Sequence, residues 1–244
     1  MTTVRLEIEY DGSGFRGWAA QPGLRTVQGE LEAALATVLR EEVQLTVAGR
    51  TDTGVHALGQ VASFATAADV RDDLARRLNG VGPDDITVTG AAAVADDFDA
   101  RRDAKSRSYL YRVLVRSAPS PLERGRALWW PHRVDPDALR ECAAALPGTH
   151  DFTAFTPTQT DHVRFDRDVL AASWRDDGDI LAFQIEADAF MRNMVRVLVG
   201  TMLEVGGGRR TLDSYTQLLA GAPRSAAGDT APPHGLYLER VRYA

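Results

Sequence analysis

The chain has little of several things that would place it in a special class of protein. Cys142 is the only cysteine, so an intrachain disulfide is excluded and a zinc site is disfavoured. Its helical surroundings predict a small buried hydrophobe. No apolar run approaches the ~18 residues that a membrane-spanning helix needs. The first residues enter a strand pattern with no apolar secretory core. We therefore expect a cytoplasmic protein with no membrane partner.

Catalytic and cofactor motifs are also scarce. There is no Walker A sequence and no G-x-S-x-G. No H-E-x-x-H or close metal-ligand spacing occurs among the five histidines, His56, His132, His150, His162 and His234. Gly12–Gly17 matches G-x-G-x-x-G, but the helix that should follow directly is delayed to about Val27, which disfavours a dinucleotide site.

The triplet Asp52-Thr53-Gly54 is also found in aspartic proteases, and Asp229-Thr230-Ala231 follows later in the chain. A protease dyad needs two aspartates that share a proton in a mostly β fold. The predicted helices contradict that fold, and Arg50 disfavours proton sharing. We set this interpretation aside.

Positive charge is not scarce but is concentrated in residues 101–116. The net charge is −6 and the sequence pI is about 5.4, which taken alone argues against a nucleic-acid partner. However, a single acid, Asp103, accompanies the six cations Arg101, Arg102, Lys105, Arg107, Arg112 and Arg116. A local basic surface is therefore compatible with an acidic protein.

The length of 244 residues and a hydrophobic content of 44% suit one large or two ordinary globular domains. Alternating apolar residues predict strands, and helical spacing predicts helices. We expect strands at 4–10, 43–47, 61–64, 86–94, 109–115, 169–174, 180–186 and 236–243. We expect helices at 27–39, 70–78, 136–146, 190–205 and 211–219.

This mixture favours an α+β fold with mainly antiparallel sheets. The segment 117–121, with two prolines, is a natural boundary. It predicts an N-terminal domain at 1–116 and a C-terminal domain at 122–244.

The most informative stretch is Ala48–Ala57, in which Asp52 follows an apolar run and precedes a glycine. We interpret it as a strand that ends in a tight turn displaying Asp52. Arg50, two positions earlier, would face the same side and keep the carboxylate ionised. An ionised, oriented aspartate suits a nucleophile or a general base. A turn aspartate that only holds its own backbone is the alternative from these residues alone.

Two further features stay unexplained by packing. On a strand, Arg107, Tyr109 and Tyr111 share a face, which suits phosphate contacts and stacking on a flipped-out base. We expect one of the two tyrosines to be a core residue. Arg196 lies on an otherwise apolar helix and should be buried with an anionic partner, for which Asp52 is a candidate.

Motifs along nearly the whole chain resemble those of the tRNA pseudouridine synthase A family. The resemblance rests on Gly49-Arg50-Thr51-Asp52-Thr53-Gly54-Val55-His56-Ala57, Tyr10-Asp11-Gly12, Gly17-Trp18, Ala100-Arg101, Arg107, Tyr109, Tyr111, His150-Asp151-Phe152, Met194-Val195-Arg196 and Gly235-Leu236-Tyr237. The first of these motifs is highly specific.

The resemblance implies an isomerase that converts uridine to pseudouridine at positions 38, 39 and 40 of the tRNA anticodon stem-loop, without cofactor or metal. It implies a homodimer whose subunits each have two ferredoxin-like α/β-sandwich halves that meet at an active-site cleft. Asp52 corresponds to the nucleophile, which attacks ribose C1′ or uracil C6; the sequence leaves both routes open. Arg196 corresponds to its catalytic partner.

Substrate contacts follow from the same resemblance. Tyr109 corresponds to the residue that stacks on the target base, and Arg50 to the arginine that enters the RNA helix. RNA contacts are implied for Phe98, Asp99, Ala100, Arg101, Arg102, Lys105 and Arg107. Asp99 stands where many members have histidine, which weakens the expectation for that contact. A related synthase for other RNA sites, or an inactive RNA-binding module, remains an alternative.

Overall fold

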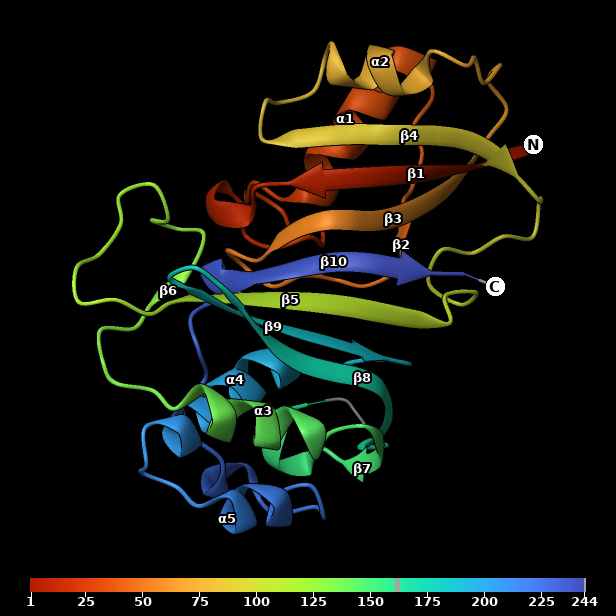
Figure 1. The fold of residues 1–244 in the computed structure, drawn as a ribbon. Helices are drawn as coiled ribbons and strands as arrows, with labels where there is room; N and C mark the ends of the chain where they lie inside the picture. The colour runs from red at the N-terminus through yellow and green to blue at the C-terminus, as the bar shows by residue number, and fades with distance from the viewer. Residues whose placement is uncertain (161–162, 244) are drawn as a thin grey trace. The chain divides into compact units, whose positions relative to one another are not determined.

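The computed structural model describes residues 1–160 and 163–243, and the chain forms two compact units. Unit 1 contains Met1–Lys105 and the segment from Tyr237 onward, and unit 2 contains Ser106–Leu236. Each combines helices with a mainly antiparallel sheet (Figure 1), which confirms the predicted α+β class. His162, one of the five histidines considered above, lies outside the described residues.

Unit 1 is built on strands in the spatial order β4-β1-β3-β10. Its strands are β1 (Thr2–Tyr10), β2 (Thr46–Val47), β3 (His56–Thr66), β4 (Ile86–Val94) and β10 (Leu236–Arg242). β1 pairs antiparallel with both β3 and β4, whereas β10 runs parallel to β3. The short β2 pairs with β3, so the chain between them reverses direction at the Asp52 turn.

Two helices, α1 (Val27–Leu39) and α2 (Leu74–Asn79), complete unit 1 and lie on one side of its sheet (Figure 1). α1 begins where the sequence predicts, because the Thr26 hydroxyl accepts a hydrogen bond from the Gly29 amide at 3.3 Å. Its Leu31 and Leu35 are buried, as are the alternate residues of β1 from Val4 to Tyr10. The core of unit 1 therefore lies between these helices and the sheet.

Unit 2 has the strand order β5-β9-β8-β7. Its strands are β5 (Ser106–Leu114), β6 (Leu128–Trp129), β7 (Gly148–Asp151), β8 (Asp166–Asp177) and β9 (Ile180–Ala187). Its helices are α3 (Pro136–Ala144), α4 (Met194–Gly206) and α5 (Leu212–Gln217). α4 is buried almost throughout, and the fully buried Cys142 of α3 confirms the prediction of a small core residue.

Several predicted elements are shorter in the structure, among them the helices Pro136–Ala144 and Leu212–Gln217, predicted at 136–146 and 211–219. The predicted strand 43–47 is reduced to Thr46–Val47, and the predicted helix 70–78 is limited to Leu74–Asn79. The helix predicted from 190 begins at Met194, because Asn193 has a left-handed φ of 63° that cannot continue a helix. Periodicity marks a helical face but does not show where the backbone leaves helical geometry.

The compact units differ from the division predicted at 117–121 in the placement of two strands. β5 precedes that segment but pairs with β9 from Arg107↔Ala187 to Leu114↔Ile180, within unit 2. β10 lies at the end of the chain but pairs with β3 of unit 1. Pairing between distant segments decides both placements, and local composition carries no signal of it.

Candidate active site

The Asp52 turn connects β2 to β3 in unit 1. The Val55 amide donates to the Asp52 carbonyl at 3.1 Å, and Gly54 has a φ of 78°. Thr51 is 7% exposed, whereas Arg50 is exposed and Asp52 half-buried. Thr51 is therefore an inner residue of the turn, whereas Arg50 and part of Asp52 remain accessible to solvent.

Two glycines, Gly12 and Gly17, pack closely against this turn. A Cβ at Gly12 would lie 1.9 Å from the Val55 carbonyl oxygen, so no other residue fits there without a shift of the backbone. Gly17 has a φ of 90°, and its Cβ would lie 2.9 Å from the Thr51 carbonyl oxygen. The next amide, that of Trp18, donates to this oxygen at 3.0 Å. Gly12 and Gly17 of the G-x-G-x-x-G match therefore permit close packing against the Asp52 turn.

His56, the first residue of β3, also contacts the loop that contains Gly12. Its Nδ1 accepts a hydrogen bond from the Gly12 amide at 3.0 Å, so that nitrogen carries no proton in this arrangement. The Asp11 carboxylate lies 3.2 Å from the same nitrogen. The buried imidazole also stacks on Tyr237 of β10, with ring centroids 4.7 Å apart. His56 thus has a structural role.

The two tyrosines of β5 have different environments in unit 2. Tyr111 is fully buried and donates from its hydroxyl to the Pro232 carbonyl at 2.8 Å, and burial raises its pKa. Both tyrosines are buried, although only one was expected to be a core residue. Tyr109 is 8% exposed and packs edge-on against Phe190, with ring centroids 4.9 Å apart. This contact fixes the plane of the Tyr109 ring.

Arg196 lies in the first turn of α4 and is half-buried. Its Nε donates to the Ala231 carbonyl at 2.6 Å, and its Nη1 donates to Asn193 Oδ1 at 2.9 Å. The Ala231 amide in turn donates to the Arg196 carbonyl at 3.1 Å. These bonds orient the guanidinium. Asn193 is not among the site residues predicted from the sequence. Its position one turn before an arginine on an apolar helix was the available signal.

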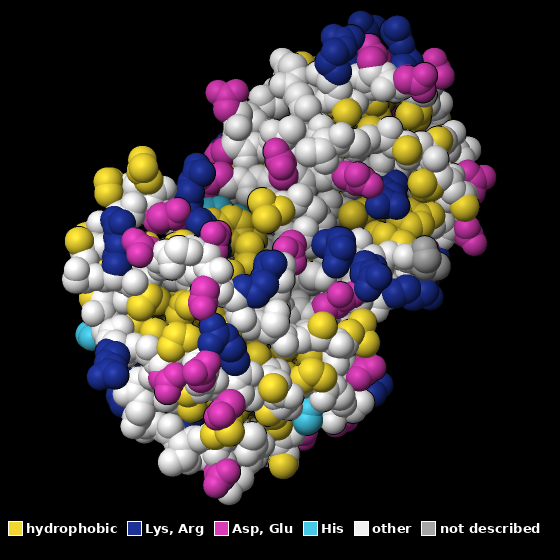
Figure 2. All heavy atoms as spheres, viewed as in Figure 1, with side chains coloured by type: hydrophobic (Ala, Val, Ile, Leu, Met, Phe, Trp, Pro, Cys, Tyr) yellow, Lys and Arg dark blue, Asp and Glu magenta, His cyan; other side chains and the backbone are white. Residues whose placement is uncertain are grey.

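The expected RNA-contacting residues fall into both units. Phe98 to Lys105 belong to unit 1, where Arg101, Arg102 and Lys105 are exposed. Arg107 is half-buried in unit 2 and donates to the Asp188 carbonyl at 2.9 Å. Over the face shown in Figure 2, basic and acidic side chains are interspersed rather than gathered by sign.

The segment before the exposed cations is held by local bonds. The Asp99 carboxylate accepts from the amides of Arg101 and Arg102, each at 2.8 Å. The Ala100 carbonyl accepts from the Tyr243 hydroxyl at 2.6 Å, and the Phe98 ring packs on Tyr243. Asp99 is therefore an acceptor for its own loop, in keeping with a structural use of aspartate at turns.

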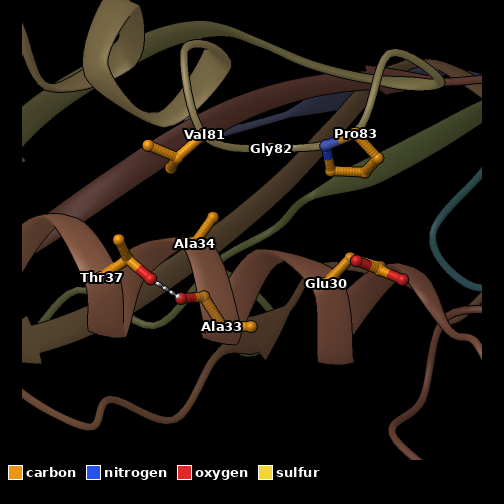
Figure 3. A pocket seen from close by; sticks show the side chains of 7 residues that line it. All are labelled: Glu30, Ala33, Ala34, Thr37, Val81, Gly82 and Pro83. Carbon is orange, nitrogen blue, oxygen red and sulfur yellow. Dashed lines mark hydrogen bonds between the residues drawn. The ribbon is translucent and has the colours of Figure 1, made fainter.

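Other parts of the described chain offer little for chemistry. No group of three or more potential metal ligands occurs among the described residues. Within the same residues, no helix is long and apolar enough to span a membrane. Figure 3 shows a hollow of about 330 Å³ between α1 and residues 81–83. Its one ionisable side chain, Glu30, is already bonded to Arg25 at 3.0 Å.

Comparison with known families decides the class of this protein. A family model described as tRNA pseudouridine synthase matches residues 7–103 and 142–244, which include Asp52 and Arg196. The chain belongs to the tRNA pseudouridine synthase family. This family consists of isomerases that convert uridine to pseudouridine.

Curated relatives of this synthase family match the chain from end to end. A tRNA pseudouridine synthase A of Frankia casuarinae is 45% identical over 252 residues, covering 100% of this chain and 90% of the relative. That of Bacillus pumilus is 41% identical over 243 residues, with 98% of each covered. That of Acetivibrio thermocellus is 40% identical over 244 residues, with 100% of each covered.

One solved structure, titled "Crystal Structure of a Cbf5-Nop10-Gar1 Complex", contains a chain that is also similar to this one. The two superpose with a TM-score of 0.36 and 12% identity, over 82% of this chain and 54% of that chain. The assignment to the synthase family rests on the sequence matches alone.

Proposed function

We propose that this protein isomerises uridine to pseudouridine at positions 38, 39 and 40 of the tRNA anticodon stem-loop, with Asp52 as the nucleophile. The carrying observation is the Asp52 turn, which presents a half-buried carboxylate beside an exposed arginine and is packed on glycines that admit no Cβ. A carboxylate held in one orientation suits covalent catalysis. Membership of the synthase family supplies the reaction class.

The reaction exchanges one bond for another. In one route a carboxylate oxygen of Asp52 bonds to ribose C1′, and uracil leaves with the electron pair of the N1–C1′ bond. C5 of the rotated uracil then attacks C1′ and displaces the carboxylate. In the other route the carboxylate first adds to uracil C6, the N1–C1′ bond then breaks, C5 bonds to C1′, and the C6–O bond finally breaks to release the carboxylate. In both, C5 loses a proton and N1 gains one, so atoms and electrons balance overall.

Other residues take supporting roles in this proposal. Arg196 pairs with Asp52, and Tyr109 stacks on the target base and assists proton removal from C5. Arg50 fills the space that the flipped base leaves. Phe98 to Lys105 and Arg107 contact the RNA, with the exposed Arg101, Arg102 and Lys105 binding phosphates. We further propose that the cytoplasmic protein acts as a homodimer on one tRNA.

The test uses an unmodified tRNA transcript with uridines at positions 38–40. Pseudouridine is mapped by carbodiimide treatment and primer extension for the wild type, Asp52→Ala and Asp52→Asn. We expect stops at these positions for the wild type and none for either variant, with tRNA binding retained, because only the nucleophile is lost. Asp69→Ala, which removes an exposed carboxylate of the same unit, is the matched control.

Each contrary result points to a different alternative. Residual turnover of Asp52→Ala within about tenfold of the wild type would remove Asp52 from the nucleophile role. Stops elsewhere in total cellular RNA, but not at 38–40, would identify a synthase for other sites. Binding of tRNA without modification of any RNA would identify an inactive binding module.

A further inference from the structure

Behind the Asp52 turn lies a chain of three buried polar side chains, Tyr10, Thr51 and Gln60. Tyr10 is 5% exposed, Thr51 7% and Gln60 0%. The Tyr10 hydroxyl lies 2.7 Å from Thr51 Oγ1. Gln60 Nε2 lies 2.8 Å from the Gly49 carbonyl oxygen and 3.4 Å from the Tyr10 hydroxyl. The three side chains come from β1, the turn and β3, so they link the turn to two neighbouring strands.

The direction of these hydrogen bonds follows from the donors present. The amide nitrogen of Gln60 has two hydrogens, of which one is donated to Gly49 and the other to the Tyr10 oxygen. The Tyr10 hydroxyl is then able to donate to Thr51 Oγ1, in a contact in which either oxygen can be the donor. Burial raises the pKa of Tyr10 to about 12, which keeps the hydroxyl protonated and able to donate.

These contacts are made to alternate residues of the turn. Gly49 is held through its carbonyl and Thr51 through its side chain, and the Thr51 carbonyl also accepts from the Trp18 amide at 3.0 Å. The residues between and after them, Arg50 and Asp52, are more exposed. A displacement of about 1 Å can slow a reaction by about 100-fold. The contacts that hold Gly49 and Thr51 therefore affect how precisely Arg50 and Asp52 are positioned.

We propose that Tyr10 and Gln60 are positioning residues, which hold Gly49 and Thr51 so that Arg50 and Asp52 face the substrate. Neither residue touches the substrate; Gln60 acts through the Gly49 carbonyl and Tyr10 through the Thr51 side chain. This inference rests on the proposed function in one respect, the role of Asp52 as nucleophile. The holding of the turn is a property of the protein alone and can be measured without substrate.

Tyr10→Phe tests the inference because it removes one hydroxyl and keeps the ring in the core. We expect kcat on the tRNA transcript to fall by about tenfold or more, with KM and tRNA affinity within about twofold of the wild type. Amide hydrogen exchange of residues 49–55 should become faster, because the Thr51 side chain has lost its anchor.

Tyr215→Phe is the matched control. Tyr215 is also fully buried, but its hydroxyl has no hydrogen-bond partner in the described part of the chain. The same chemical change should leave kcat and the exchange of residues 49–55 unaltered. If Tyr215→Phe lowers kcat as much as Tyr10→Phe, general loosening of the core explains both results and the inference is wrong.

Thr51 provides a second route to the same answer. Thr51→Val removes the accepting oxygen at nearly constant volume and should reproduce the fall in kcat and the faster exchange. Thr51→Ser keeps the hydroxyl and should retain the wild-type kcat and the wild-type exchange rate. This pair keeps the inference testable if Tyr10→Phe fails to fold.

Combined outcomes separate this inference from the proposed function. Slower turnover together with faster exchange supports the positioning role, and either change without the other overturns it. If the wild type modifies 38–40 and Tyr10→Phe does so at the same rate, the inference fails while the proposed function stands. If the wild type modifies no RNA, the proposed function fails, and unchanged exchange in Tyr10→Phe would also overturn the holding of the turn.

Discussion

Asn193 shows how one residue can serve a neighbour instead of its own helix. It precedes α4 with a left-handed φ of 63°, which asparagine adopts more readily than most residues. Its side chain does not cap α4; its Oδ1 accepts from Arg196 at 2.9 Å. Together with the Ala231 carbonyl, it directs the guanidinium. Asn193 therefore helps to orient the Arg196 side chain.

Asn193→Gly should lower kcat by about tenfold, with little change in the melting temperature. Glycine accepts the left-handed backbone without strain, so only the acceptor for Arg196 is lost. The measurement is kcat and KM on the tRNA transcript, with thermal unfolding alongside. Asn193→Asp keeps an oxygen acceptor and should retain most of the activity. Wild-type kcat in Asn193→Gly would show that the Ala231 carbonyl suffices to orient Arg196.

At the scale of elements, α4 is packed closely against residues 228–231. A Cβ at Gly200 would lie 1.9 Å from the Asp229 carbonyl oxygen. The Gly228 amide donates to the Thr201 hydroxyl at 3.0 Å, and the Ala231 amide donates to the Arg196 carbonyl at 3.1 Å. The helix and the segment thus form one structural piece around Arg196.

Gly200→Ala should destabilise the protein by about 1–3 kcal/mol, because the added methyl group pushes residues 228–231 away from α4. The measurement is the midpoint of urea unfolding. Gly80→Ala is the control: its φ of −77° suits alanine, and its Cβ would meet no atom closer than 3.5 Å. If the unfolding midpoints of Gly200→Ala and the control are equal, the close packing at Gly200 does not contribute to the free energy of unfolding.

At the scale of the whole molecule, an acidic protein belongs to a family named for a polyanionic substrate. The net charge of −6 repels RNA at long range, so we expect binding to depend on local cations, for which we propose the exposed Arg101, Arg102 and Lys105. Counterion release from the bound phosphates then governs affinity.

We expect tRNA affinity to fall linearly with salt on logarithmic axes between ~50 and 200 mM, with a slope that reflects several phosphate contacts. Replacing Arg101 by alanine removes one phosphate contact and should reduce the magnitude of the slope by about 1. Filter binding at several salt concentrations measures both. A flat response in the wild type would contradict binding through the cations.

Much of the element pattern could be predicted from the chain because it is a local property. Apolar spacing marked α1 and α4, the Thr26 cap marked where α1 begins, and the glycines from Gly206 marked where α4 ends. The motif around Asp52 identified the family and the displayed turn. The roles of Asp52, Arg50, Tyr109 and Arg196 stay predictions, since they depend on the bound substrate.

What the sequence by itself determined is the α+β class, the tight turn at Asp52 and the synthase family, because periodicity, turn chemistry and a specific motif are written in neighbouring residues. Tertiary structure alone decided that β5 belongs to unit 2 and β10 to unit 1, that glycines 12 and 17 pack against the Asp52 turn, and that Tyr10 and Gln60 lie behind it. These depend on contacts between residues far apart in the chain, such as Tyr237 and His56, which are 181 positions apart (237 − 56). Only the folded chain brings such residues together.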